Sequence, residues 1–259
     1  MYGYGYNSIL NKMDGVSYDA DALAFIAAYS ITDTTQKAAI NTAVTSLKAG
    51  TLWGKGDVIL PYVGGNATAH RGNLKNATNG VTWFGGITHN SSGVIFNGST
   101  GYGDVAFALS AGNALDRSFA HSVKNNPAAQ SGWSGNFNGS VVFGVQLNES
   151  GGFLIEGVGV NSLVNTTIYI PYGVVVNSIT SNTSGKIYKN DGTLIYTNAS
   201  VGSTPNSGNM FTGALSNSGS PILYNARTAD FEYYGSGLTA LEATELIGII
   251  NTFNTTLGR

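Results

Sequence analysis

The sequence predicts a mainly β protein, in which a β-sandwich or barrel is preceded by two helices and followed by one. Between about residues 52 and 235, apolar residues alternate with polar ones or form short runs, as they do in β-strands. Gly, Asn and Asp residues separate these runs at the short intervals typical of sandwiches. Helical periodicity is confined to the two ends of the chain. Because the 259 residues show no internal repeat and no linker, we expect a single domain over residues 16–259.

Residues 1–15 begin with alternating Tyr and Gly and then lose any pattern. Such a segment does not bury enough apolar surface to fold alone, so we expect an N-terminal arm or anchor that orders on a partner. Tyr2, Tyr4 and Tyr6 are the candidate partner-anchoring residues, because aromatic side chains are enriched at protein interfaces. A disordered arm is the alternative.

Two helices are expected next, over about residues 20–30 and 33–49. Asp19 or Asp21 can cap the first helix and Asp33 the second, because a short acidic side chain accepts hydrogen bonds from the free N–H groups at a helix N-terminus. Both segments repeat apolar residues three and four positions apart, which gives each helix one face to bury.

The clearest hairpin of the β region is "KIYKNDGTLIYTN", residues 186–198, in which Gly192 supplies the positive φ of a tight turn. In "VIFNGSTGYGD", residues 94–104, Asn97-Gly98 is expected to turn the chain between two strands rather than to bind a ligand. The strands are predicted at residues 58–63, 81–86, 93–98, 140–147, 152–158, 166–170, 186–190, 193–198 and 231–235.

A last helix is expected over about residues 239–256. Thr239 and Glu242 have the spacing of a capping box, in which each side chain accepts a hydrogen bond from the backbone N–H of the other residue. The apolar residues from Leu246 to Leu257 then fall on one helix face. We expect this face to pack on the sandwich beside the two N-terminal helices.

Several of these segments resemble a known class of domain. Residues 94–109, "VIFNGSTGYGDVAFAL", resemble the early strand–turn–strand of concanavalin A-like, laminin-G-like jelly rolls, and residues 186–198 resemble a late hairpin of the same domains. Residues 235–259, "GSGLTALEATELIGIINTFNTTLGR", resemble a helix that closes such a domain. The resemblance implies a jelly-roll β-sandwich with two N-terminal helices and one C-terminal helix.

The helical opening at residues 19–65, together with this jelly roll and the ending "FNTTLGR", is similar to bacteriophage virion surface proteins of the spike, head-fibre and tail-fibre-like kind. The resemblance implies a structural protein exposed on the virion surface, assembled in the host cytoplasm and bound to capsid, penton or tail proteins. It also implies a homo-oligomer, expected to be a trimer, whose loops contact a host-surface glycan. Residues 1–15 have no counterpart in that family.

The composition excludes several other classes of partner. The net charge is −2, only 10% of residues are charged, and no basic cluster is present, so nucleic-acid binding is not expected. The chain has no cysteine, which excludes disulfides and thiolate chemistry. The N-terminus lacks the apolar core of a secretory signal peptide. No apolar stretch is long enough to predict a membrane span.

No sequence pattern of an enzyme is found, and the protein is predicted not to be one. Glycoside hydrolysis needs two carboxylates across a cleft, whereas Glu149, Glu156 and Glu232 are isolated in the sequence. Glu156, an acid within an apolar run, is interpreted as a solvent-facing strand residue. Nucleophile motifs, phosphate loops and dinucleotide fingerprints are also absent.

No metal ion or other cofactor is predicted. His70, His89 and His121 do not have the spacing of zinc ligands. Calcium binding is considered only by analogy with the fold class. Carboxylates in turns can bind calcium, but they more often cap the turns themselves. The calcium candidates, by residue type alone, are Asp57, Asp104, Asp116 and Asp191.

Residues 131–140, "SGWSGNFNGS", form the strongest binding candidate and are predicted to be a loop. The rings of Trp133 and Phe137 suit the apolar face of a sugar, and the amide of Asn136 suits its hydroxyl groups. The alternative is that both rings fill the edge of the sandwich or a contact between subunits.

A dedicated carbohydrate-binding lectin is therefore the first alternative to a structural virion protein, and a polysaccharide-cleaving enzyme is the second. Titration with host polysaccharide distinguishes the lectin from the structural virion protein, because a purely structural protein gives no saturable signal. A reducing-sugar assay tests the enzyme.

Overall fold

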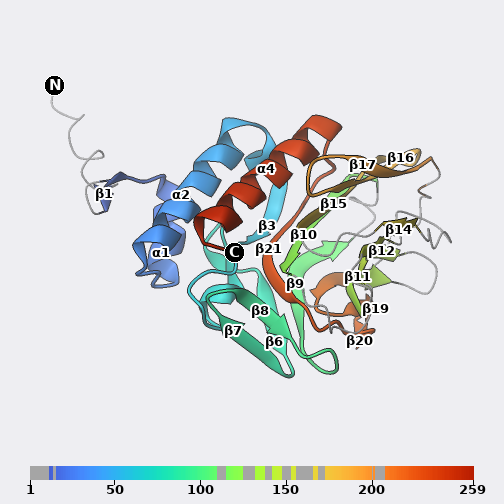
Figure 1. Cartoon of the computed structure of the whole chain (residues 1–259), viewed down its shortest axis with the longest axis horizontal. Coiled ribbons are helices and arrows are strands. Elements are labelled where there is room, and N and C mark those ends of the chain that lie inside the picture. The colour runs from blue at the N-terminus through green and yellow to red at the C-terminus, as the bar shows by residue number, and fades with distance from the viewer. Residues whose placement is uncertain are drawn as a thin grey trace.

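The computed structural model describes residues 12–13, 16–109, 115–124, 132–137, 142–147, 153–155, 166–168, 173–199, 201 and 208–259. Over these residues the chain is mainly β, with curled sheets in a sandwich-like arrangement and a layer of helices on one side (Figure 1). The helices are α1 (Ala20–Ala28), α2 (Thr34–Ala49), α3 (Leu52–Lys55) and α4 (Ala240–Thr256), and a 3-10 turn lies at Ala69–Arg71.

The larger sheet has eight strands, all paired antiparallel. Seven follow the order β17-β16-β15-β10-β21-β8-β7, and β3 also pairs with β21. The central strands β10 and β21 are buried along almost their whole length, because both faces of the sheet are covered. The strands are β3 (Gly56–Leu60), β7 (Ile87–Asn90), β8 (Gly93–Phe96), β10 (Arg117–Lys124), β15 (Gly173–Ser181), β16 (Ser184–Lys189), β17 (Leu194–Asn198) and β21 (Thr228–Gly235).

Two shorter sheets form the opposing layer, in the orders β18-β9-β6 and β14-β13-β12-β11-β19-β20. Only β11 and β19 pair in parallel among the described pairs. The strands are β6 (Val81–Phe84), β9 (Tyr102–Leu109), β11 (Gly132–Phe137), β12 (Val142–Leu147), β13 (Phe153–Ile155), β14 (Thr166–Ile168), β18 (Gly208–Thr212), β19 (Leu215–Asn217) and β20 (Ser220–Ile222). Two small ladders pair β1 (Lys12–Met13) with β2 (Val16–Ser17) and β4 (Gly72–Asn73) with β5 (Thr78–Asn79).

Two hydrophobic cores lie on opposite faces of the larger sheet. Successive strand residues point to opposite faces, so the central strands contribute to both cores. Phe119 and Tyr234 pack between the two sheet layers. Ala120 and Tyr233, their chain neighbours on β10 and β21, pack under the helices. The sandwich and the helical layer are therefore held by the same two strands.

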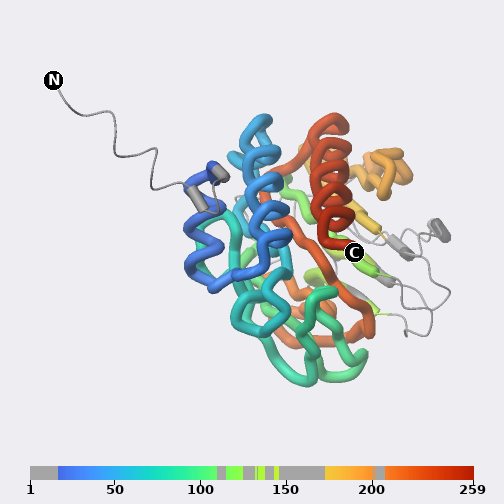
Figure 2. Tube along the Cα trace, turned by 60° about the vertical axis from the view of Figure 1, so that its left-hand side comes forward, coloured from blue at the N-terminus to red at the C-terminus, as the bar shows by residue number. Residues whose placement is uncertain are grey.

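Helices α2 and α4 lie side by side over the outer face of the larger sheet (Figure 2). The predicted order of two helices, a β region and a final helix agrees with the structure, and α1, α2 and α4 begin and end within two residues of their predicted bounds. Asp19 and Asp33 act as N-caps, accepting hydrogen bonds from the backbone N–H groups of Asp21 and Gln36. No helix of the described chain is long and apolar enough to cross a membrane.

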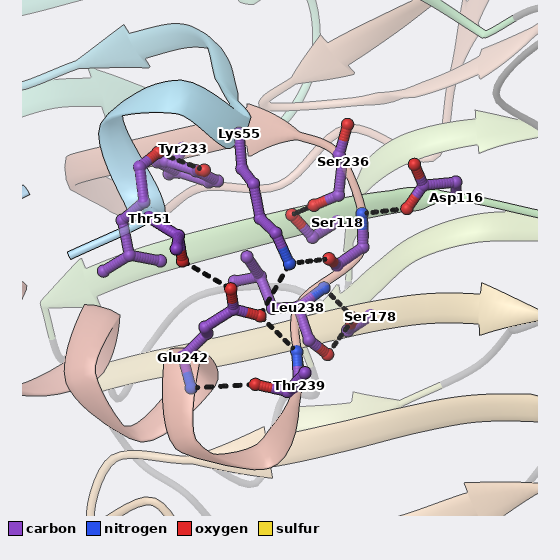
Figure 3. Close-up of polar contacts among 12 residues, drawn as sticks. Thr51, Lys55, Asp116, Ser118, Ser178, Tyr233, Ser236, Leu238, Thr239 and Glu242 are labelled. Atoms are coloured by element: carbon purple, nitrogen blue, oxygen red, sulfur yellow. Dashed lines mark hydrogen bonds and ion pairs between the residues drawn. The ribbon is translucent and has the colours of Figure 1, made fainter.

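A polar network fixes the N-terminus of α4 against α3 (Figure 3). The capping box is present: Thr239 Oγ1 accepts from the Glu242 backbone, and Glu242 Oε2 accepts from the Thr239 backbone at 2.7 Å. Glu242 also accepts hydrogen bonds from Thr51 Oγ1 and from Lys55 Nζ, the latter at 2.7 Å. Lys55 donates a second bond to the carbonyl of Gly237, so one lysine connects α3 to the segment that leads into α4.

The prediction that residues 131–140 form a loop is wrong for Gly132–Phe137, which is strand β11. Gly135 has a φ of 153° and faces Gly144 on β12, and a Cβ on Gly135 would lie 2.5 Å from the Cα of Gly144. The glycines that suggest a loop therefore allow two backbones to approach closely. Pairing with β12 and β19 stabilises a strand that its composition does not favour.

Candidate carbohydrate-binding face

The outer face of β9 carries an aromatic and an acidic side chain. Every second residue of this strand is buried, whereas Tyr102 and Asp104 lie on the partly exposed side. On the neighbouring strand β6, Phe84 is exposed and is the register partner of Tyr102. Residues directly opposite each other in an antiparallel pair share a face, so Phe84 and Tyr102 are neighbours on the surface.

Phe84, Tyr102 and Tyr224 form a continuous surface that we call the aromatic face. The ring of Phe84 stacks on Tyr102 with centroids 4.9 Å apart and planes inclined by 13°, and Tyr224 meets Tyr102 edge-on at 6.2 Å. The buried ring of Phe211, on the neighbouring strand β18, packs against Tyr102 with centroids 4.8 Å apart. Phe84 is 43% exposed, and Leu223, next to Tyr224 in the chain, is 53% exposed. The face is thus a supported apolar surface in contact with solvent.

A polar pair borders the aromatic face. Asp104, two residues after Tyr102, accepts a 2.7 Å hydrogen bond from Asn209 Nδ2 on β18. Burial raises the pKa of Asp104, and this hydrogen bond acts against the rise. Burial also raises the pKa of Tyr102, with further contributions from Tyr224 and Asp104. At neutral pH the Tyr102 phenol is therefore protonated and can both donate and accept hydrogen bonds.

The turn before β9 positions Tyr102. Asn97 Oδ1 accepts hydrogen bonds from the backbone N–H groups of Ser99, Thr100 and Gly101 at 2.9–3.0 Å. Gly98 has a φ of 72°, a conformation that L side chains rarely adopt. The interpretation of Asn97-Gly98 as a turn is confirmed, and the side chain of Asn97 is occupied in making that turn.

The residues predicted to bind a glycan lie on β11 rather than on this face. Asn136 is fully buried, and its Nδ2 donates to the backbone carbonyl of Asn209 at 2.9 Å. In this structure Asn136 therefore joins β11 to β18 and offers no surface to a ligand. Phe137 is half-buried, and the side chain of Trp133 lies outside the described residues, so their role in glycan binding stays a prediction. The predicted anchors Tyr2, Tyr4 and Tyr6 also lie outside the described residues.

A buried polar cluster around Glu232 was missed by the sequence patterns. Glu232 is fully buried, and its Oε2 accepts hydrogen bonds from Tyr62 at 2.6 Å and Tyr234 at 2.9 Å. Its Oε1 accepts from Thr212 Oγ1 at 2.6 Å and pairs with His121 Nδ1 at 2.6 Å. Burial, followed by the charge of Glu232, raises the pKa of both tyrosines well above its usual value. The signal available in the sequence was an acid within the aromatic run "ADFEYYG".

The structure brings two of the three histidines together. His70 Nδ1 and His89 Nδ1 lie 3.0 Å apart, so one ring donates a hydrogen bond to the other. Burial lowers the pKa of His70 to about 3 and lowers that of His89, which keeps the pair neutral near pH 7. His121 belongs to the Glu232 cluster instead. In the part of the chain that the structure describes, no three His, Cys, Asp or Glu side chains converge as metal ligands.

The calcium candidates are spread over different elements. Asp116 Oδ1 accepts from the backbone N–H of Gly237 at 2.8 Å, and Asp191 accepts from the backbone N–H of Thr193 at 2.9 Å in the β16–β17 turn. Asp57 is exposed, and Asp104 is paired with Asn209. Asp191 thus fixes local backbone, as turn carboxylates commonly do, whereas Asp116 fixes the distant segment that leads into α4.

The sequence matches no protein-family model, and no curated protein matches it. Solved structures do match. A mutant of Trypanosoma rangeli sialidase displaying trans-sialidase activity has a TM-score of 0.54 at 14% identity, over 81% of this chain and 39% of that one. Trypanosoma rangeli sialidase in complex with 2,3-difluorosialic acid has a TM-score of 0.53 at 13% identity, over 82% and 38%. The chain therefore spans less than half the length of these sialidases, and the similarity shows the fold alone.

Domain 4 of an extracellular GH43 arabinanase from Geobacillus stearothermophilus, in complex with arabinotriose, is matched over 74% of this chain and 98% of that one, at 14% identity. Its TM-score of 0.43 is too low to support an argument.

These comparisons contradict the prediction that the protein is not an enzyme. Sialidase chains contain a region of this fold, so the lack of a paired-carboxylate motif in the sequence does not exclude an enzyme. Assignment to the bacteriophage virion surface stays a prediction.

Proposed function

We propose that the protein binds carbohydrate through its aromatic face, on a sandwich whose strands follow the jelly-roll order that the sequence resemblance implies. The observation that carries this proposal is the partly exposed stack of Phe84 on Tyr102 beside the Asp104–Asn209 pair. The similar sialidase structures support it through their fold, because that fold occurs in proteins that act on sugars.

A sugar ring complements this surface in two ways. Its C–H groups form an apolar face that can cover the exposed ring of Phe84, and its hydroxyl groups form a rim that needs both donors and acceptors. The support of Tyr102 by Phe211 fixes the ring before binding, so little conformational entropy is lost on association. Asp104 and Asn209 supply the adjacent acceptors and donors.

The polar groups of the face favour an uncharged sugar. Its border contains a carboxylate and an amide, and none of the residues that define the face or its border is cationic. An acidic sugar placed there would bring a second negative charge close to Asp104. We therefore assign neutral oligosaccharides to the aromatic face.

Isothermal titration with a panel of neutral oligosaccharides tests this assignment. Tyr102→Ala removes the central ring and should weaken binding by roughly tenfold or more. Asp104→Asn keeps the shape and removes the charge, and should weaken binding less. Leu194→Ala is the matched control, because Leu194 is 46% exposed on β17, away from this sheet.

Circular dichroism establishes that each variant is folded. Equal affinity of wild type and Tyr102→Ala, or the absence of saturable binding across the panel, would reject the aromatic face as the binding site.

A further inference from the structure

A separate cavity of about 530 Å³, which contains several polar side chains in its lining, lies where the larger sheet meets the last turns of α4. This volume is within the range of sites that hold small molecules. Residues at the end of β10, the start of β15, the β16–β17 turn and the end of α4 line the cavity. None of them belongs to the aromatic face. The lining side chains that carry the argument are Ser122, Lys124, Asp230, Asn251, Asn254 and Arg259.

A β-bulge directs one carboxylate towards this cavity. The pairing of β10 with β21 runs from Ser122–Phe231 to Val123–Ala229, so Asp230 is the extra residue of the bulge. Bulges redirect side chains relative to the regular alternation of a strand. The Asp230 side chain consequently meets α4, where Asn254 Nδ2 donates to its Oδ1 at 3.0 Å. Burial raises the pKa of Asp230, and hydrogen bonds from Ser122 and Asn254 act against the rise.

Asn254 leaves an acceptor without a partner in this cavity. Its Nδ2 donates to Ser122 Oγ at 3.1 Å as well as to Asp230, which fixes the orientation of the amide. The residue is 8% exposed, and its Oδ1 is buried with no hydrogen-bond donor among the described residues. A buried acceptor without a donor is costly. A ligand hydroxyl that donates to Asn254 Oδ1 would remove this cost.

The two cationic side chains of the cavity, Arg259 and Lys124, differ in their hydrogen bonding. The guanidinium of Arg259 donates to the backbone carbonyls of Tyr62 at 2.7 Å, Asp230 at 3.2 Å and Ser91 at 3.1 Å, so it holds loops together. The ammonium group of Lys124 forms no ion pair or hydrogen bond with a described residue. Burial lowers its pKa, although the charge of Asp230 acts to raise it. Among the lining side chains, two are cationic and one is a carboxylate, and this excess of positive side-chain charge favours an anionic ligand.

We propose that this cavity binds a small hydroxylated carboxylate of the sugar-acid class. The ligand carboxylate lies at the ammonium group of Lys124, and a ligand hydroxyl donates to Asn254 Oδ1. A second hydroxyl is placed beside Asp230 and Asn251. The site is independent of the aromatic face in its elements, its charge and its ligand.

Isothermal titration with D-glucuronate, and with D-glucose as the uncharged analogue, tests the proposal on the full chain carrying Tyr102→Ala, in which the aromatic face no longer contributes binding of the neutral sugar. We expect saturable binding of glucuronate and roughly tenfold weaker binding of glucose. Lys124→Gln should lower the affinity for glucuronate about tenfold and make the two probes equivalent. Lys186→Gln, on β16 and outside the cavity lining, is the charge-matched control and should bind as the wild type does.

Side-chain amide NMR signals locate the ligand without relying on a variant. Glucuronate should shift the signals of Asn254 and Asn251. Absence of saturable glucuronate binding, equal affinity for glucose, or unchanged affinity in Lys124→Gln would each overturn the proposal. Tyr102→Ala should keep glucuronate binding while losing neutral oligosaccharides, so failure of one site is distinguishable from failure of the other.

Discussion

Glu242 is a single residue whose titration should be visible in the stability of the whole chain. Burial alone would raise its pKa, but hydrogen bonds from Lys55, Thr51 and the Thr239 backbone outweigh burial and lower the pKa to about 2, from an ordinary value of 4.5. Between these two values the unfolded chain binds the proton more tightly than the folded chain. The stabilisation is therefore fully present above pH 4.5 and is lost as the pH falls towards 2.

Glu242→Gln should consequently unfold at lower urea concentration near neutral pH and should show a shallower loss of stability on acidification. Urea denaturation at a series of pH values measures both effects. Exposed Glu245, on the same helix, provides the control Glu245→Gln. If Glu242→Gln loses stability with decreasing pH as steeply as the wild type does, the pKa of Glu242 does not change on folding.

Individual polar residues also show where sequence reasoning reaches its limit. Asn97 was assigned correctly, because a turn side chain bonds to backbone groups two to four residues away. Glu232 and Asn136 could not be assigned, because Tyr62, a partner of Glu232, and Asn209, the partner of Asn136, are distant in the sequence. The same applies to the aromatic face, since Phe84 and Tyr224 are neighbours of Tyr102 only through the pairing and packing of distant segments.

At the scale of elements, the helices were predictable and the weak strands were not. Caps and periodic apolar faces are local signals, so α1, α2 and α4 lie close to where the sequence indicates. Strands β11, β18, β19 and β20 are rich in Gly, Ser and Asn, which are typical of loops, and they form because neighbouring strands pair with them.

Two glycines in different elements should respond in opposite directions to the same substitution. Gly135→Ala places a Cβ 2.5 Å from the Gly144 Cα and 2.6 Å from the Phe143 carbonyl oxygen, at a φ of 153°. It should destabilise the β11–β12 pair and lower the melting temperature. Gly248 lies inside α4 with open space around its Cβ position. Gly248→Ala should raise the free energy of unfolding by about 0.5–1 kcal/mol, because Ala loses less backbone entropy in a helix.

Thermal unfolding followed by circular dichroism compares the two glycine variants with the wild type. A Gly135→Ala chain as stable as the wild type would mean that β11 and β12 do not approach as closely as described. A destabilised Gly248→Ala chain would mean that this face of α4 is covered rather than open.

At the scale of the whole molecule, two cores share one sheet. Phe231 on β21 packs under the helices, and Tyr234 on the same strand packs between the sheets. If either core melted, one face of β10 and β21 would become exposed. The two strands would then lose packing that holds them in position for the remaining core. We therefore expect the helical layer and the sandwich to unfold in one cooperative transition, although the chain is longer than most two-state domains.

Paired core variants test this coupling. Leu246→Ala opens a cavity in the helical core and Phe107→Ala opens one in the sandwich core, and each should cost about 3 kcal/mol. Because Trp53 packs against the helical core, the fluorescence is measured in a Trp53→Phe background, in which the remaining tryptophans lie on the sandwich strands β6 and β11. Because both cores depend on β10 and β21, each variant should lower the melting temperature of the helix signal in circular dichroism and of this fluorescence by the same amount. If Leu246→Ala melts the helices while the fluorescence transition stays in place, the two layers fold independently and the shared sheet does not couple them.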